Sequence, residues 1–187
     1  MYKDESLKKY LDDLAARLPA PGGGSAAAFN AALGAALISM VVNFTLGKPK
    51  YAKYEKELNN ILDKSEILRM EFLRLTDLDV IAYKSKNLRD ALNTPFMVAR
   101  LALEGIKLCP PLVKKGNINL ISDVAVAAIL LESAFASAYF NVEINLKALN
   151  DLKLKKAIRK ELSQKAKLVK KIRTDMEGKV GKVINAR

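Results

Sequence analysis

The sequence predicts an all-α protein, a multihelical bundle of long antiparallel helices with a dimeric helical core. Three observations support this class. Every long segment repeats its apolar residues at helical spacing, and none alternates apolar and polar residues as a strand does. Glycine and proline separate these segments. Half of the 187 residues are hydrophobic and 28% are charged, which is a globular composition with enough length to bury a core.

The first half of the chain contains three predicted helices. Residues 4–17 are amphipathic, and two prolines shortly afterwards end this helix. Residues 25–46 form the second helix, which holds no charged residue. Pro49 suits the first turn of a third helix, whose apolar pattern continues from residue 51 to about residue 87.

The second half contains three more predicted helices. Thr94 is the predicted N-cap and Pro95 the first residue of a helix that runs to Leu108. A long apolar helix follows over about residues 120–149, and a basic helix covers about residues 152–176. We find no internal repeat, so we expect a single domain.

The net charge of +12 lies mostly in the C-terminal segment. Residues 1–150 hold 19 Lys and Arg against 16 Asp and Glu, or +3, whereas residues 151–187 hold 13 against 4, or +9. A segment of this kind can bind nucleic acid or an anionic surface, but a solvated helix face is the preferred explanation. No aromatic residue follows Phe140 to stack on bases, so we do not expect nucleic acid as a partner. The predicted domain therefore spans residues 1–187, with a basic C-terminal helix at about 151–187.

Two predicted helices carry almost no charge. The helix at residues 25–46 has none, and the one near residues 120–142 has only Asp123 and Glu132. A helix that is apolar all round lies either in a protein core or in a membrane. Alanine, glycine and asparagine within the first helix and the absence of an aromatic belt argue against a membrane. We therefore expect a homodimer whose subunits share a helical core.

The most distinctive local feature is the Pro-Gly-Gly-Gly-Ser sequence at residues 21–25, directly before the uncharged helix. An ordered glycine costs roughly 0.5–1 kcal/mol relative to alanine, so three in a row are expected only where the structure or a ligand requires them. A glycine-rich turn at a helix N-terminus exposes backbone N–H groups beside the positive end of the helix dipole, which suits an anion. Ser25 is the predicted N-cap. A close-packed turn between two helices is the alternative explanation.

Few residues are available for acid–base chemistry, because the chain has no histidine and a single cysteine. Asp123 begins an apolar helix, where it is either a carboxylate with a tuned pKa or a first-turn residue that stabilises the helix dipole. Asp79 shares a helix face with Tyr83, although surface carboxylates fit the local pattern better. Asn117 is either a turn former or a ligand contact.

Lys48, Lys50 and Tyr51 place two ammonium groups and a phenol at a helix entrance. The lysines can bind a carboxylate or phosphate, or simply lie in a solvated turn. No metal-ligand cluster, phosphate-binding loop or dinucleotide fingerprint is present. The charged opening sequence does not look like a signal peptide, so we expect a cytoplasmic location.

Taken together, these motifs resemble the cyclodeaminase and methenyltetrahydrofolate cyclohydrolase family of folate enzymes. The pairing of the triglycine loop with the later Gly-Asn and Ser-Asp elements is more specific than either alone. The matching segments are collinear over about residues 1–150: residues 18–28, 34–37, 40–41, 45–51, 77–79, 116–117, 122–123 and 141–146.

The resemblance implies an all-helical homodimer that acts on the one-carbon unit bridging two nitrogens of tetrahydrofolate. We expect a formiminotetrahydrofolate cyclodeaminase, which closes 5-formiminotetrahydrofolate to 5,10-methenyltetrahydrofolate and releases ammonia. Methenyltetrahydrofolate cyclohydrolase, which opens the methenyl bridge with water, is the alternative. A non-catalytic helical nucleic-acid-binding protein is a more distant one. Neither folate reaction needs a metal or a redox cofactor.

The resemblance also implies roles for particular residues. Asp123, Asp79 and Tyr51 are the predicted catalytic residues. The glycine loop is expected to meet an anionic part of the folate or its pterin ring, and the two lysines its glutamate tail. The predicted substrate-binding residues are Gly22, Gly23, Gly24, Ser25, Lys48, Lys50 and Asn117.

Overall fold

The computed structural model describes residues 1–186, and every regular element in that range is helical, as predicted. Short 3₁₀ turns lie at Tyr2–Asp4, Pro49–Tyr54 and Ile118–Leu120. The α-helices are α1 (Leu7–Ala15), α2 (Gly23–Asn43), α3 (Glu55–Ser85), α4 (Leu88–Ile106), α5 (Cys109–Lys115), α6 (Ile121–Lys147) and α7 (Leu152–Asn185).

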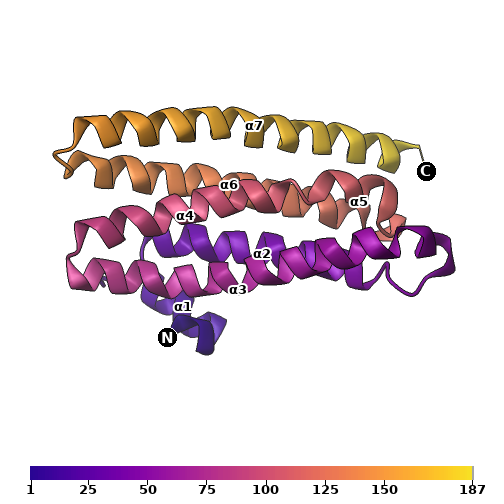
Figure 1. Cartoon of the computed structure of the whole chain (residues 1–187). Coiled ribbons are helices and arrows are strands. Elements are labelled where there is room, and N and C mark those ends of the chain that lie inside the picture. Colours follow the sequence, from indigo (N-terminus) through magenta and orange to yellow (C-terminus); the bar gives the residue numbers. More distant parts are fainter. Residues whose placement is uncertain (187) are drawn as a thin grey trace.

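The long helices lie side by side in a bundle (Figure 1). Helix α2 packs mainly against α3 and α6, while α4 and α7 also pack on α6. From α3 onward, the long helices α3, α4, α6 and α7 alternate in direction (Figure 1). The α3–α4 and α6–α7 turns therefore lie at the same end of the bundle as the start of α2. The chain segment between α2 and α3 lies at the opposite end (Figure 1).

Small residues let the two uncharged helices approach closely. Ala31 and Ala35 of α2 are fully buried. A Cβ atom at Gly34 would lie 2.8 Å from the Leu131 Cγ of α6, so this position has no room for a side chain. The alanine- and glycine-rich composition of α2 therefore serves helix packing.

Helix α2 and the segment Ile118–Lys147 are each long and apolar enough to cross a membrane. In this fold they are neighbours within the bundle. The most apolar stretch of α2 is 61% buried, whereas that of the second segment is only 39% buried. Helix α6 therefore leaves an apolar face uncovered.

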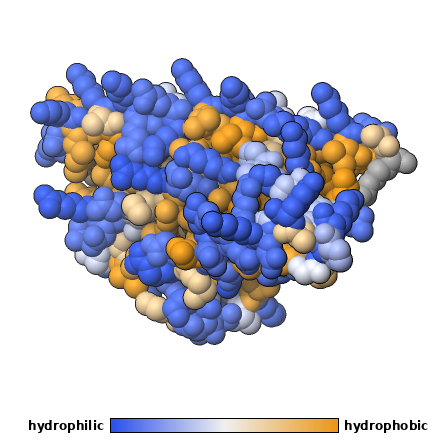
Figure 2. Space-filling model, turned by 45° about the vertical axis from the view of Figure 1, so that its right-hand side comes forward, coloured by the Kyte–Doolittle hydropathy of each residue, from blue (hydrophilic) through white to orange (hydrophobic). Residues whose placement is uncertain are grey.

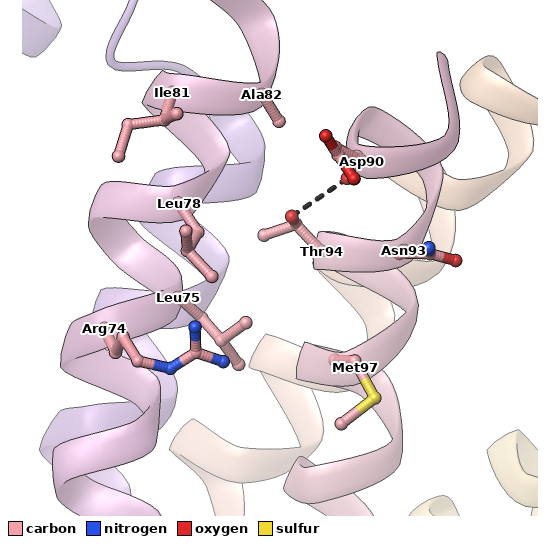
Figure 3. A pocket seen from close by; sticks show the side chains of 9 residues that line it. All are labelled: Arg74, Leu75, Leu78, Ile81, Ala82, Asp90, Asn93, Thr94 and Met97. Atoms are coloured by element: carbon pink, nitrogen blue, oxygen red, sulfur yellow. Dashed lines mark hydrogen bonds between the residues drawn. The ribbon is translucent and has the colours of Figure 1, made fainter. Parts of the chain in front are cut away.

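Helix α4 begins seven residues earlier than predicted. Asn87 is its N-cap, and the Asn87 Oδ1 accepts the backbone N–H groups of Arg89 and Asp90. The Thr94 hydroxyl donates to the Asp90 carbonyl at 2.9 Å, so it bonds back along the helix instead of capping it (Figure 3). The prediction that Thr94 starts the helix was therefore wrong.

Pro95 lies inside α4, where a proline normally breaks a helix. It has no N–H for the carbonyl of Ala91, four residues earlier. The side-chain amide of Asn145 in α6 donates to that carbonyl at 2.6 Å. A polar side chain from the neighbouring helix thus replaces the missing backbone hydrogen bond, and α4 continues.

Helix α7 runs to Asn185, which lies beyond the basic pattern at about residues 152–176 and within the predicted C-terminal helix at about 151–187. Met176 and Val180 are buried against the bundle and extend the packed face. The short helix α5 follows α4 where the sequence predicted only a break at two prolines, because those prolines occupy its first turn.

The Asn145 contact predicts a specific pattern of stabilities. Asn145→Ala leaves the Ala91 carbonyl without a partner and is expected to lower the free energy of unfolding by about 1–3 kcal/mol. In a Pro95→Ala background the new backbone N–H can reach the same carbonyl, so Asn145→Ala should cost less there. Urea denaturation of the four proteins in a double-mutant cycle measures this coupling. An equal cost in both backgrounds would contradict the assignment.

Candidate active site

The triglycine loop forms the first turn of α2. Gly22 is the N-cap residue and has no side chain to accept the free N–H groups of that turn. The Ser25 N–H instead donates to Oδ2 of Asp79, on α3, at 2.9 Å. The N-terminus of α2 therefore binds a carboxylate of the same chain, and the predicted contact of the loop with a part of the folate stays a prediction.

Ser25 lies inside the helix and does not cap it, which corrects the predicted role. Its buried hydroxyl donates to the Thr76 carbonyl of α3 at 3.0 Å and lies 3.2 Å from the Tyr10 hydroxyl of α1. This side chain ties α2 to both neighbouring helices. It is enclosed by protein, so it holds the loop in place and does not face the cleft.

The Asp79 carboxylate leaves room only for glycine at position 24. A Cβ atom at this position would lie 2.1 Å from the Asp79 Oδ1, well inside any permitted contact. A Cβ atom at Gly22 would meet nothing within 4 Å, and one at Gly23 would only touch the Asn141 side chain at 3.4 Å. Only the third glycine makes room for Asp79, and the first two leave backbone open to the cleft.

Burial raises the pKa of the Asp79 carboxyl above its ordinary value, and the hydrogen bond from the Ser25 N–H opposes this effect. Removal from water is thus the stronger influence on this carboxyl. Its Oδ1 has no hydrogen bond within residues 1–186. A carboxyl with a raised pKa and one free oxygen is suited to moving a proton.

Asp79 opens into a cleft of about 280 Å³ between the start of α2 and the end of α6. Asn141 on α6 faces Gly23 and donates to the Ser137 carbonyl at 2.9 Å, which leaves its side-chain oxygen free to accept. Asn145 donates to the Ala91 carbonyl of α4, and both asparagines line the cleft. The remaining lining residues are Pro19, Ala20, Gly22, Gly24, Tyr83, Ala91 and Ile144.

The other predicted site residues lie at the opposite end of α2. Lys48 and Lys50 are exposed on the segment between α2 and α3, and Lys48 lines a pocket of about 190 Å³. Tyr51 is buried beside them, and its hydroxyl oxygen accepts the Ile118 N–H at 3.2 Å. The tyrosine thus anchors the segment before α6, and its proposed role as a proton donor stays a prediction.

Asn117 and Asp123 belong to this second group. The Asn117 side chain donates to the Phe44 carbonyl at 3.2 Å and accepts the Asn119 N–H at 3.2 Å, so it holds two segments together. Asp123 is half-buried in the first turn of α6 and forms no hydrogen bond or ion pair with any residue in the range 1–186. Its carboxylate is therefore available to a ligand.

The predicted site residues thus form two groups rather than one. The glycine loop and Asp79 lie at the start of α2, whereas Lys48 and Tyr51 follow its end and Asp123 lies in the first turn of α6, near that end. Figure 1 shows the two ends of α2 at opposite ends of the bundle. A helix of 21 residues is about 30 Å long, so the groups do not meet within one chain.

Two further observations concern what else this chain can bind. Within the described part of the chain, no group of three or more Cys, Asp or Glu side chains is placed to hold a metal ion. A separate pocket of about 230 Å³ lies between α3 and α4 (Figure 3). Apolar side chains and the polar side chains of Arg74, Asp90, Asn93 and Thr94 line it. None of the predicted site residues lines this pocket.

Comparison with known proteins identifies the family. A sequence model described as formiminotransferase-cyclodeaminase matches residues 6–86 and 84–164. The chain belongs to the formiminotransferase-cyclodeaminase family. It is therefore an enzyme of folate one-carbon metabolism, of the cyclodeaminase or cyclohydrolase kind, as the resemblance implied.

Some relatives are named as cyclohydrolases and others as cyclodeaminases. The chain is 37% identical over 174 residues to a methenyltetrahydrofolate cyclohydrolase of Methylorubrum extorquens, covering 81% of this chain and 84% of that protein. It is 32% identical to the formimidoyltransferase-cyclodeaminase of Rattus norvegicus, of which it spans about a third (34%). The crystal structure of a formiminotetrahydrofolate cyclodeaminase from Thermotoga maritima superposes with a TM-score of 0.84 at 29% identity, covering 100% of this chain and 98% of that one.

The contact between Gly24 and Asp79 predicts that these two positions depend on each other. Gly24→Ala must displace the carboxylate, so we expect loss of stability and of turnover. Gly22→Ala is the matched control, because its new methyl group meets no atom and its φ of −140° suits alanine. Thermal unfolding of both variants tests this. Equal behaviour of the two variants would show that Asp79 does not determine the glycine at position 24.

Proposed function

We propose that this chain is a methenyltetrahydrofolate cyclohydrolase that adds water to the methenyl carbon of 5,10-methenyltetrahydrofolate and yields 10-formyltetrahydrofolate. The relative that supports this most strongly is the Methylorubrum extorquens protein, which is similar over most of both chains. This preference reverses the order in which the sequence alone ranked the two activities.

Formiminotetrahydrofolate cyclodeaminase is the second candidate, because the Thermotoga maritima protein of that name has the same fold over its whole length. Both reactions pass through a tetrahedral carbon between two nitrogens, and both need a group that accepts and returns a proton. One site can therefore serve either substrate. The family identification removes the alternative of a non-catalytic nucleic-acid-binding protein.

The observation that carries the proposal is the Asp79 carboxyl, which is buried, has a raised pKa and opens into the cleft. In the hydrolytic reaction the ionised carboxylate takes a proton from water as its oxygen attacks the methenyl carbon. The same proton then passes to the 5-position nitrogen as its bond to carbon breaks. The remaining hydroxyl proton leaves to solvent as the formyl group forms, so one proton is released overall.

The other roles follow the same geometry. Gly22 and Gly23 let the flat pterin approach the loop backbone, and the free Asn141 oxygen accepts a hydrogen bond from it. Lys48 and Lys50 are proposed to bind the glutamate carboxylates, with Asn117 and Asp123 near them. Because this group lies about 30 Å from the Asp79 cleft within one chain, it can meet the same substrate only from the second subunit of the proposed homodimer. The atoms and charges of the reaction balance without a metal or a redox cofactor. We further propose that residues 1–187 act as one domain, as a cytoplasmic homodimer.

Asp79→Asn tests the catalytic assignment. The amide keeps an oxygen that can accept the Ser25 N–H but cannot take up a proton, so we expect turnover to fall by about 10²–10⁴-fold. Asp77→Asn is the matched control, because Asp77 is also buried but accepts the Tyr2 N–H at 2.7 Å, outside the cleft. The assay follows the loss of methenyltetrahydrofolate absorbance above the buffer rate. Wild-type turnover in Asp79→Asn would exclude Asp79 as the proton-transfer group.

The same carboxyl predicts opposite effects of pH on activity and on stability. Activity that needs ionised Asp79 is lost as the pH falls through its raised pKa. The stabilising effect of the protonated form is complete below the unfolded value of about 3.9 and is lost as the pH rises through the raised folded pKa. Asp79→Asn should therefore be at least as stable as the wild type at neutral pH. A stability loss at neutral pH that is absent at pH 3 would contradict this sign.

The two candidate activities are separated by substrate. Faster loss of methenyltetrahydrofolate absorbance supports cyclohydrolase. Appearance of that absorbance from 5-formiminotetrahydrofolate, with release of ammonia, supports cyclodeaminase. Turnover of neither substrate by the wild-type protein would overturn the proposed function.

A further inference from the structure

The cleft around Asp79 contrasts in charge with the rest of the molecule. Hydrophilic side chains cover much of the surface (Figure 2), and the chain has 32 Lys and Arg. In the part of the chain that the structure describes, none of these lines the cleft. Lys84, on α3, lines a different pocket. The polar side chains of the cleft are Asp79, Tyr83, Asn141 and Asn145. A basic protein thus has a cleft with one carboxyl group, one aromatic ring and no cation.

Tyr83 lies one helical turn after Asp79 on α3 and lines the same cleft. Residues four apart on a helix share a face, so the two side chains start about 6 Å apart along α3. Tyr83 is 58% exposed, and its hydroxyl forms no hydrogen bond with any described residue. The ring is therefore open to a ligand that occupies the cleft.

Other aromatic rings of this chain lie beside a cation of the protein. The Arg100 Cζ is 4.2 Å from the centre of the Phe96 ring. The Lys53 Nζ is 5.0 Å from the centre of the Tyr54 ring. The negative face of an aromatic ring attracts a cation at such distances. Tyr83 has no such partner among the described residues, so a positively charged ligand can take that position.

The size of the cleft indicates which part of a folate enters it. Ligand pockets commonly hold about 300–1,000 Å³, so a cleft of about 280 Å³ suits a fused ring system and not a whole folate. In 5,10-methenyltetrahydrofolate the bridging carbon belongs to an amidinium, whose positive charge is shared by the two nitrogens. The protonated formimino group of 5-formiminotetrahydrofolate is also an amidinium. Both candidate substrates thus bring a positive charge to the reacting carbon.

We propose that the Tyr83 ring lies over the amidinium of the bound folate, with Asp79 beside it, so that the cleft binds a cationic one-carbon unit in preference to a neutral one. This inference rests on the proposed folate reaction. Tyr83 is then a residue that determines specificity. When water adds to the methenyl bridge, the positive charge leaves as a proton and the contact with the ring weakens. The neutral product is therefore held less tightly than the substrate.

The environment of Asp79 supports the same assignment. Burial raises the pKa of this carboxyl, because removal from water disfavours its ionised form. A positive charge in the cleft lowers that pKa again and stabilises the carboxylate. A cationic substrate therefore helps to keep Asp79 in the form that accepts a proton from water.

The affinities of a matched pair of folates test the role of Tyr83. 5,10-Methenyltetrahydrofolate is the cation, and 5,10-methylenetetrahydrofolate has the same fused ring system without the charge. Their dissociation constants are measured in Asp79→Asn, where turnover is expected to be slow, by a titration completed before the buffer hydrolyses the cation. Adding Tyr83→Leu should weaken binding of the cation by about 2–30-fold and leave binding of the neutral folate nearly unchanged.

Two further variants separate the effect of charge from that of shape. Tyr83→Phe keeps the aromatic face and should keep the preference for the cation. Ile144 lines the same cleft and is 57% exposed, so Ile144→Ala should weaken binding of both folates by the same factor.

The outcomes distinguish this inference from the proposed function. Equal weakening of both folates by Tyr83→Leu would overturn the inference, as would loss of the preference in Tyr83→Phe. If Tyr83→Leu removes the preference but the wild-type protein turns over neither folate substrate, only the proposed function fails. Binding of neither folate would overturn both.

Discussion

The hydrogen bond between the Ser25 N–H and the Asp79 carboxylate is the contact on which the site depends. It joins Ser25, in the first turn of α2, to Asp79, which lies near the C-terminal end of α3 and 54 residues later in the chain. Helix α2 needs an acceptor at its N-terminus, because Gly22 offers no capping side chain. Asp79 supplies that acceptor, and its position leaves room only for glycine at residue 24.

Two opposing effects act on this carboxylate. The N–H group at the positive end of α2 stabilises its charged form, whereas burial destabilises it. Burial has the larger effect, so the pKa of Asp79 lies above its ordinary value. The result is a carboxyl that is fixed in place by one oxygen and remains able to exchange a proton through the other. Positioning and reactivity therefore come from the same arrangement.

Hydrogen bonds from neighbouring elements hold Ser25 and the adjoining part of α3 in place. The Tyr10 hydroxyl of α1 lies beside the Ser25 hydroxyl, which in turn bonds α3 at the Thr76 carbonyl. Asp77 accepts the Tyr2 N–H and thereby fixes the first 3₁₀ turn to the same part of α3. On the far side, Asn145 both supports α4 at Pro95 and lines the cleft. The start of α2 is thus held or lined by residues of α1, α3, α4 and α6.

Apolar periodicity was sufficient to predict the helices and most of their limits, because each helix buries one face along its length. The periodicity gave the wrong start for α4. The residue that allows Pro95 inside that helix is Asn145, which is 50 residues away in the sequence. The triglycine loop predicted an anion at a helix N-terminus, but sequence does not show that the anion is Asp79, since that contact exists only after folding. The order of the motifs along the chain likewise does not show that the site residues lie in two groups, one at each end of α2.

The most direct test of this account is a carbon-detected NMR titration of the Asp79 side-chain carboxyl in the wild-type protein, with its signal assigned by comparison with Asp79→Asn. The account predicts a midpoint above the value of about 3.9 for an aspartate in water. A midpoint at or below that value would show that the helix N-terminus outweighs burial, and it would contradict a role for Asp79 as the group that moves the proton.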